Sequence, residues 1–251
     1  MTYREFQPNV QLVPYIETYW TAYGFKEKEE SYRILPDGCV DIVISLSSSS
    51  HFGLKPFVPN IVGAMTTYGL GSYHKTVHLV GIRFRPVGFT AFCRVPIFEF
   101  TDKRIDLTLV DSLFDELFYA GLMEKATTEE VIRHIDAYFL GKQELFFNPE
   151  PQIVHSVNLI RQSGGILPLS EVAANSCLSL RHFERKFKTA VGVSPKTFSK
   201  IIKFQYTCSY LKNNPDLSLF SVAFDCGYYD QAHLIKDFRF LSGRSPSYFK
   251  E

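Results

Sequence analysis

Four side chains in the C-terminal half have the types and the spacing that contact with a nucleic acid requires. Arg181, Glu184, Arg185 and Lys188 would share one face of a helix, within two turns of one another. Arginine can pair bidentately with guanine, and arginine and lysine can both pair with phosphate oxygens. Such a face can therefore reach base edges and phosphates together.

A second segment carries the corresponding positions 51 residues later, where Ala232, Ile235, Lys236 and Arg239 stand. Alanine and isoleucine offer only apolar contact, for instance to a thymine methyl group. We therefore expect helix 179–190 to supply more of the base specificity and helix 230–241 more of the backbone anchoring. The predicted DNA-binding residues are Ser179, Arg181, Glu184, Arg185, Lys188, Asp230, Gln231, His233, Lys236 and Arg239.

Both segments lie inside an internal repeat, which supplies the elements that must position them. The copies align at an offset of 50 residues, which becomes 51 after one extra residue in the second turn. Each copy reads as a short helix, a turn and a longer amphipathic helix, which predicts two helix-turn-helix units. The matched positions are Leu169/Leu219, Val172/Val222, Ala173/Ala223, His182/His233, Phe187/Phe238, Lys188/Arg239, Gly192/Gly243, Ser194/Ser245, Pro195/Pro246 and Phe198/Phe249.

Each longer helix has an expected start, end and buried stripe. Ser179 and Asp230 are the expected caps, because their side chains can accept hydrogen bonds from the free N–H groups of the first turn. Gly192 and Gly243 are expected to end the helices. The expected buried stripes are Phe183, Phe187 and Ala190 in the first copy and Leu234, Phe238 and Leu241 in the second.

The segment between the copies approximates helical spacing from Pro195 to Leu211. A helix of about 17 residues is about 26 Å long. Adjacent major grooves on one side of a duplex are about 34 Å apart. A linker helix of this length can therefore hold two reading helices on one side of DNA.

Residues 152–251 resemble the DNA-binding domain of AraC/XylS-type transcription regulators, in which a long helix joins two helix-turn-helix units. The resemblance rests on LSEVAANSCLSLRHFERKFKTAVGVSPKTF and SVAFDCGYYDQAHLIKDFRFLSGRSPSYFK, and the run from Phe238 to Phe249 is its most characteristic part. It implies a DNA-contacting surface at Arg181, Glu184, Arg185, Gln231 and Lys236.

Cys177 and Leu178 depart from this family pattern, which usually has a glycine in the turn. If the position requires a positive φ, cysteine costs about a kcal/mol or somewhat more. The first unit would then be slightly strained or differently turned.

Charge is distributed unevenly along the chain. Residues 1–149 hold 14 Lys and Arg against 18 Asp and Glu, a net charge of −4, whereas residues 150–251 hold 13 against 8, or +5. The basic half is the half with the repeat, as binding to a polyanion requires. Five scattered cysteines, no apolar signal core and no membrane-length apolar run lead us to expect a cytoplasmic protein with no membrane partner. The resemblance to AraC/XylS-type regulators implies a bacterial protein.

The first half is rich in aromatic and β-branched residues between positions 12 and 100, which predicts strands. From 107 to 145 the pattern changes to two helices, the second capped by Thr127 or Thr128 with Glu130 nearby. We expect these helices to pack on the β-domain or across a dimer. The sequence QELFFNPEPQ is the best candidate for a linker between domains.

The fold class expected is α+β, with a β-rich domain over residues 1–148 and an all-α DNA-binding domain over residues 149–251. Within the latter, the helix-turn-helix units span about 167–192 and about 218–243, joined by a linker helix over about 195–212. PDGCVD and GIRFRPVGF resemble an uncharacterised sensor-type domain often found in front of this module. That resemblance implies a cupin-like β-barrel.

Five residues of the first half are candidates for contact with an effector: Asp37, Cys39, Asp41, Arg83 and Arg85. Turn capping and hydrogen bonding are the favoured roles for the first three, and structural salt bridges for the arginines. His74 and His78 would share one face of a strand, where surface or pocket roles are favoured over a metal site.

The favoured function is a sequence-specific transcription regulator that binds double-stranded DNA and responds to a small-molecule effector. The alternative is a DNA-targeted enzyme or repair protein with catalysis in the first half. No C-x-x-C, phosphate loop, helical metal motif or nucleophile elbow supports that alternative, so we expect no catalytic residue, cofactor or metal. A homodimer is a possible assembly, and RNA polymerase is an expected partner of an activator.

Overall fold

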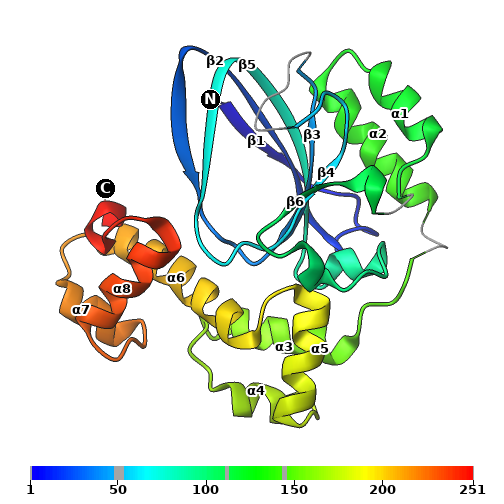
Figure 1. Cartoon of the computed structure of the whole chain (residues 1–251). Coiled ribbons are helices and arrows are strands. Elements are labelled where there is room, and N and C mark those ends of the chain that lie inside the picture. Colours follow the sequence, from blue (N-terminus) through cyan, green and yellow to red (C-terminus); the bar gives the residue numbers. More distant parts are fainter. Residues whose placement is uncertain (1, 48–53, 111–112, 143–145, 251) are drawn as a thin grey trace.

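The N-terminal part of the chain is built on one antiparallel sheet. The computed structural model describes residues 2–47, 54–110, 113–142 and 146–250, without the side chains of residues 26–30 and 73–75. Its six strands pair in the order β1-β2-β5-β3-β4-β6 (Figure 1). Their bounds are Thr2–Phe6, Ile16–Ile34, Val40–Ser45, Asn60–Val62, Gly69–Phe84 and Arg104–Asp106 for β1 to β6.

Two helices cover one face of this sheet. Alternate strand residues such as Ile42, Ile44 and Ile82 join one buried cluster with Phe118 of α1 (Glu116–Met123) and Phe139 of α2 (Thr128–Gly141). Figure 1 shows α1 and α2 beside the sheet. Within this chain, the helices thus pack on the sheet, which is the first of the two arrangements that the sequence suggested.

The start of the helical region differs from the prediction. Residues 107–109 form a 3-10 turn, and α1 begins only after Asp115, whose side chain accepts a hydrogen bond from the N–H of Phe118. The second start is as predicted, because Thr127 and Glu130 form a capping box. Periodicity predicted the presence of both helices. It did not predict that the first begins at Glu116, because the residues before the Asp115 cap are also apolar in part.

The C-terminal part is all-helical and contains two helix-turn-helix units. α4 (Leu169–Asn175) and α5 (Leu180–Val191) form the first, and α7 (Leu219–Asp225) and α8 (Gln231–Ser242) form the second. α3 (Pro151–Gln162) precedes them, and α6 (Pro195–Asn213) joins them. The predicted α+β fold class is confirmed. No helix in the described part of the chain is long and apolar enough to cross a membrane.

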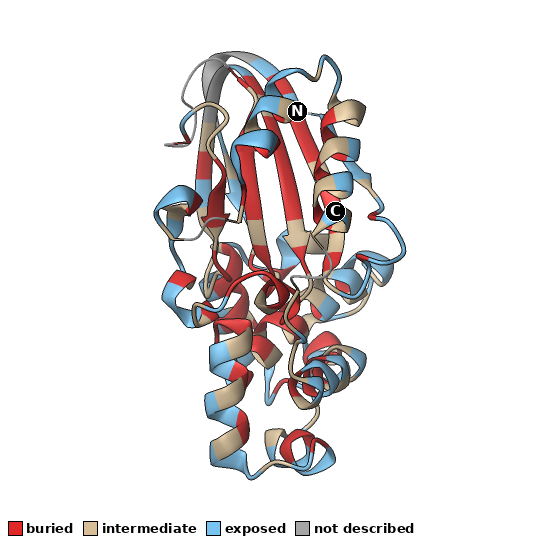
Figure 2. Cartoon of the chain, turned by 90° about the vertical axis from the view of Figure 1, so that its right-hand side faces the viewer, coloured by how far each residue is buried: buried red, intermediate tan, exposed pale blue. Residues whose placement is uncertain are grey.

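Each helix-turn-helix unit has its own core, and the sheet domain contributes to both. Ala64 and Val87 belong to the buried cluster around Phe183, Phe187 and Phe198. The partly buried Leu35 packs against the second cluster, which surrounds Phe238. Buried residues run from the strands into the junction with the helices (Figure 2). The two halves therefore share apolar contacts.

The sheet is open among the described residues, since no pairing joins its edge strands β1 and β6. Its second face carries a smaller apolar cluster of Ala22, Val43, Leu54, Val77 and Leu79. α1 and α2 do not cover this second face, where a cavity described below lies.

The turn of the first unit has the strain that the sequence suggested. Cys177 adopts a φ of +54°, and Gly227, at the matching position of the second unit, has +69°. The left-handed region is costly for a residue with a Cβ atom and not for glycine. Gly227 in the second unit thus adopts without strain the left-handed conformation that Cys177 adopts in the first.

We expect Cys177→Gly to raise the free energy of unfolding by about 0.5–1 kcal/mol, because relief of strain exceeds the added entropy of the unfolded chain. Urea denaturation measures the change. Cys177→Ala is the control, since it removes the thiol and keeps the strain. Equal stabilisation by both substitutions would show that the thiol and not the backbone is responsible.

Candidate nucleic-acid interface

The predicted reading face of the first unit is exposed on α5. Arg181, Glu184 and Arg185 are all exposed, while Phe183 and Phe187 are buried on the opposite face. Neither arginine has an ion-pair partner among the residues that the structure describes. A hollow of about 320 Å³ lies over this face, lined by Ser179, Arg181, His182 and Arg185. These guanidinium groups are therefore available to an external ligand.

Two details of the first unit differ from the prediction. Ser179 stands at the N-cap of α5, but its side chain makes no capping hydrogen bond. Ala190 is only half-buried, and Val191 completes the buried stripe instead. Lys188 is exposed, yet its Nζ lies 5.5 Å from the ring centroid of Phe98 in the sheet domain. It marks the end of the reading face nearest to that domain.

The second unit presents Gln231, Lys236 and Arg239 to solvent from α8. Asp230 caps this helix, as predicted, by accepting a hydrogen bond of 2.7 Å from the N–H of His233. Leu234, Phe238 and Leu241 form the predicted buried stripe. The imidazole of His233 lies 3.6 Å from a carboxylate oxygen of Asp237 and packs edge-on against Tyr228, so it contacts residues of its own unit.

Single replacement of Lys236 or Arg239 by alanine is expected to weaken binding nearly equally on all DNA sequences. Each should reduce the slope of log K against log salt concentration by about one unit, because one phosphate contact is lost. Binding titrations at several salt concentrations measure this slope. An unchanged slope would mean that the side chain neutralises no phosphate.

The second face of the sheet carries a cavity of about 450 Å³, which we call the sensor cavity. Its walls are mainly apolar and aromatic, with five charged residues among them, a composition common in sites for small molecules. Its lining residues are Tyr3, Trp20, Ala22, Tyr32, Arg33, Ile34, Leu35, Asp37, Asp41, Val43, Leu54, Val62, Leu79, Arg83 and Arg104.

Three of the charged residues that line this cavity form an ion cluster. Arg83 Nη2 lies 3.2 Å from Asp41 Oδ2, and Arg83 Nε lies 3.2 Å from Asp37 Oδ2. The indole of Trp20 donates a hydrogen bond of 3.0 Å to Asp41. Burial raises the pKa of Asp41 to about 6, although Arg83 acts in the opposite direction. The salt bridges favoured for Arg83 are thus present, inside the cavity.

Two effector candidates, Cys39 and Arg85, lie apart from the sensor cavity. Asp37 lines the cavity and also accepts a hydrogen bond from the N–H of Cys39, which is the turn-capping role that the sequence favoured. The thiol of Cys39 points toward Glu17 (3.3 Å) and not into the cavity, and Nε of Arg85 donates to the carbonyl of Val13. Spacing along the chain could not show this, because the loop after β2 turns Cys39 away from the cavity.

Sequence patterns missed the contact between Glu17 on β2 and Arg161 on α3. Their side chains form an ion pair of 3.3 Å between the two halves of the chain. Burial alone would raise the pKa of Glu17, but Arg161 overrides this and holds the pKa below its ordinary value. Two residues 144 positions apart in sequence carry no local signal of such a pairing.

The stability of the protein should depend on Asp41 between about pH 4 and pH 6. Its pKa of about 6 in the folded protein exceeds the unfolded value of about 3.9, so this group stabilises the fold at low pH. That contribution is lost as the pH rises through about 6. Denaturation at several pH values should therefore show a slope in this window that Asp41→Asn reduces. An identical slope in the variant would contradict the assignment.

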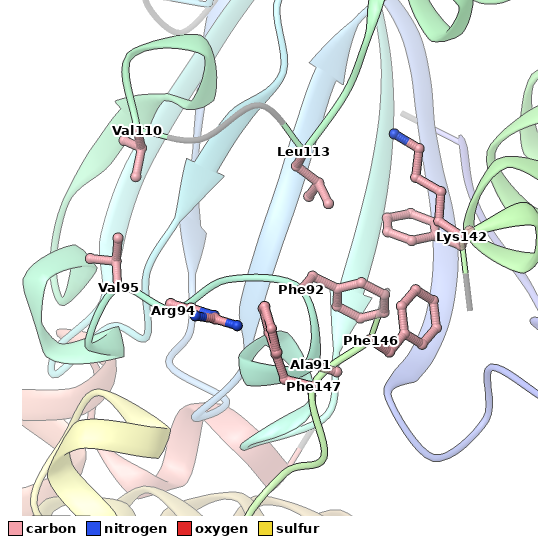
Figure 3. Close-up of a pocket in the computed structure, with 10 residues that line it drawn as sticks. Ala91, Phe92, Arg94, Val95, Val110, Leu113, Lys142, Phe146 and Phe147 are labelled. Atoms are coloured by element: carbon pink, nitrogen blue, oxygen red, sulfur yellow. The ribbon is translucent and has the colours of Figure 1, made fainter. Parts of the chain in front are cut away.

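A second apolar cavity, of about 430 Å³, lies where α2 ends (Figure 3). Phe92, Phe139, Phe146 and Phe147 form its aromatic walls. Its two cations have partners, since Lys142 pairs with Asp115 at 3.0 Å and Arg94 lies over the ring of Phe147. The neighbouring residues 111–112 and 143–145 lie outside the described part of the chain.

No group of three or more His, Cys, Asp or Glu side chains that could hold a metal ion occurs within the described ranges. His78 Nε2 is 3.1 Å from the hydroxyl oxygen of Thr128, and the side chain of His74 is outside the description. The cysteines of the described residues are free thiols.

The fold and the exposed basic helices define a helix-turn-helix protein. Residues 172–251 match a family model described as a helix-turn-helix domain, and residues 4–106 match one described as a domain of unknown function (DUF6597). The C-terminal part is therefore a helix-turn-helix domain, as the sequence predicted, and a domain of unknown function precedes it.

The chain is similar, at low sequence identity, to a curated protein and to solved structures. An uncharacterized HTH-type transcriptional regulator of Haemophilus influenzae is 24% identical over 123 residues, which span 48% of this chain and 41% of that protein. The solved structure of ToxT from Vibrio cholerae is similar with a TM-score of 0.47 and 10% identity, over 92% of this chain and 97% of ToxT. The C-terminal domain of AraT from Geobacillus stearothermophilus has a TM-score of 0.37 and 22% identity, over 40% and 84%.

Proposed function

We propose that the protein is a sequence-specific transcription regulator that binds double-stranded DNA and responds to a small-molecule effector. The observation that carries this proposal is the pair of exposed basic helices α5 and α8, each packed on its own core. A helix of this kind reads base edges in the major groove while neighbouring cations pair with phosphates. The 19 residues of α6, about 28 Å in length, separate the two units.

Selection of bound sequences from a random duplex library tests the DNA-binding function. The full chain at near-physiological salt should enrich a site with two short conserved blocks about one helical turn apart. A single block would mean that only one unit reads bases. No enrichment, together with binding that vanishes as salt is added, would contradict sequence-specific reading by the free protein.

The sensor cavity is the proposed effector site, with Asp37, Asp41 and Arg83 as its polar contacts. Its size and its apolar walls with a few converging polar groups support this assignment. We place the boundary between sensor and DNA-binding domains at residues 148 and 149, shortly before α3 begins at Pro151. A thermal-shift screen of small molecules against wild type and Arg83→Gln tests the site, since a true effector should stabilise wild type more.

We propose a regulatory and not a catalytic role for the N-terminal domain, and a bacterial cytoplasm as its location. Metal analysis of the purified protein tests the first point, because stoichiometric zinc or iron would revive the enzyme alternative. A contact with RNA polymerase is proposed only for the case of an activator.

The N-terminal domain is also proposed to form a homodimer. Leu117 and Met123 of α1 are 81% and 63% exposed, which leaves apolar surface on the side of α1 away from the sheet. Light scattering at high concentration tests this assembly, and a monomeric mass would contradict it.

A further inference from the structure

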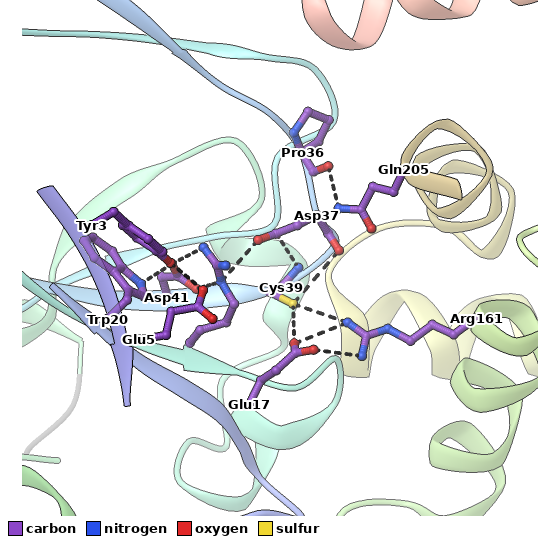
Figure 4. Close-up of polar contacts among 11 residues, drawn as sticks. Tyr3, Glu5, Glu17, Trp20, Pro36, Asp37, Cys39, Asp41, Arg161 and Gln205 are labelled. Atoms are coloured by element: carbon purple, nitrogen blue, oxygen red, sulfur yellow. Dashed lines mark hydrogen bonds and ion pairs between the residues drawn. The ribbon is translucent and has the colours of Figure 1, made fainter. Parts of the chain in front are cut away.

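A short segment between β2 and β3 contacts both the sensor cavity and the DNA-binding domain. We call residues 35–39 the coupling loop. Leu35 and Asp37 line the sensor cavity. The carbonyl of Pro36 accepts a hydrogen bond of 3.2 Å from Nε2 of Gln205 on the linker helix α6 (Figure 4). One five-residue loop thus forms part of the cavity and also part of the surface on which α6 lies.

The contact with α6 depends on a glycine. Gly38 has a φ of +75°, and a Cβ atom there would lie 2.5 Å from Cε2 of Phe198. The ring of Phe198 is fully buried, and its centroid lies 5.5 Å from that of Phe187 on α5. Because the loop backbone touches this ring directly, a displacement of the loop must be accommodated by the first turn of α6 and by the core beneath α5.

Asp37 fixes the position of the loop through two contacts. One carboxylate oxygen lies 3.2 Å from Nε of Arg83, and the other accepts the hydrogen bond from Cys39. Arg83 is shared, because it also pairs with Asp41. A ligand group that binds Arg83 would therefore compete with Asp37 while the contact of Asp41 with Trp20 remained.

The Asp37–Arg83 pair also separates two cavities. Both residues line the sensor cavity and a polar cavity of about 300 Å³ that Arg161 and Gln205 of the DNA-binding domain help to form. Figure 4 shows Arg161 and Gln205 reaching toward this loop from two different helices. Loss of the ion pair would therefore act at the contact surface between the domains and not only inside the sensor domain.

We propose that the coupling loop transmits occupancy of the sensor cavity to the two reading helices. A ligand that draws Arg83 away from Asp37 frees the loop, which loosens its contacts with Phe198 and Gln205 and allows α6 to shift. The relative placement of α5 and α8 changes with it, and so does their fit to DNA. This mechanism rests on the proposed function of the cavity as an effector site. It describes how binding at that site would control DNA binding.

Asp37→Asn in the full chain imitates the liganded state, because it weakens the pair with Arg83 without altering any residue of the DNA-binding domain. Hydrogen exchange should become roughly fivefold faster in peptides that cover residues 35–39 and the first turns of α6. Affinity for the selected DNA site should change by roughly threefold or more. Asp115→Asn is the matched control, since it weakens an ion pair with Lys142 in the same domain and away from the loop. It should change neither quantity.

Gln205→Ala provides a second variant, which removes the contact from the side of α6 and should also speed exchange in the loop. Unchanged exchange in both variants overturns the coupling, whatever the DNA result. Faster exchange with unchanged DNA affinity also overturns it, because the loop would then move without effect on reading. Failure of the proposed function gives a different result, because wild type would then select no DNA sequence at all. The exchange rates of the variants, which are measured without DNA, would still show whether the loop contacts α6.

Discussion

Joint replacement of Arg181 and Arg185 by alanine is expected to weaken binding at the selected DNA site by roughly 2–6 kcal/mol, or about 1–3 kcal/mol for each side chain. Both guanidinium groups are exposed on α5, next to the same hollow. They lie one helical turn apart, so they can reach neighbouring base pairs in one major groove. Competition binding with the selected duplex measures the loss.

The pattern of the loss is as important as its size. If these arginines read bases, single substitutions should relax the preference at one base pair and should weaken binding to unrelated DNA much less. Arg133→Ala is a matched control, because it removes the same charge from an exposed position on α2 of the sensor domain. Equal weakening on every sequence would contradict base reading by Arg181 and Arg185.

Phe238→Ala should destabilise the second helix-turn-helix unit by about 3–5 kcal/mol, through lost burial and the cavity left behind. Phe238 is fully buried. Its ring centroid lies 4.8 Å from that of Phe204 on α6 and 5.4 Å from that of Phe249. The loss approaches the whole stability of a small domain, which is about 5–15 kcal/mol, so α7 and α8 should unfold at a lower temperature than the rest.

Hydrogen exchange during mild heating would show whether the loss is confined to this unit. Phe224→Ala is the control, because Phe224 is 81% exposed on α7 of the same unit and should change stability by less than about 0.5 kcal/mol. Comparable destabilisation by the two substitutions would mean that the unit is not organised around Phe238.

The repeat made the C-terminal fold predictable in detail. The two copies have matched apolar positions, so each predicts the same buried stripe independently. Phe187 and Phe238, for example, occupy equivalent buried positions. The positive φ of Cys177 agrees with the expectation drawn from the family pattern, which usually has a glycine in this turn. Exposure of the basic face was predictable for the same reason, because a helix that buries one stripe presents the opposite side to solvent.

The N-terminal half was predictable only in its element types. Alternation identified the strands, but which face of the sheet the helices cover depends on contacts between distant residues. The cavity illustrates the limit, since Trp20, Asp41 and Arg83 come from three strands and meet only after the sheet has formed. Residues 35–39 carry turn signals in the sequence, which do not distinguish an ordinary turn from one that contacts a second domain.

The unequal pair of reading helices gives the molecule a direction. A symmetric dimer binds a palindrome and has the same appearance from either end of its site. In this chain the arginines of α5 and the Lys236 and Arg239 of α8 differ in kind, and α6 connects them in a fixed order. A site read by one chain therefore has a left end and a right end. Reversing that site in front of a gene would turn the whole protein around and carry its sensor domain to the opposite end of the bound segment.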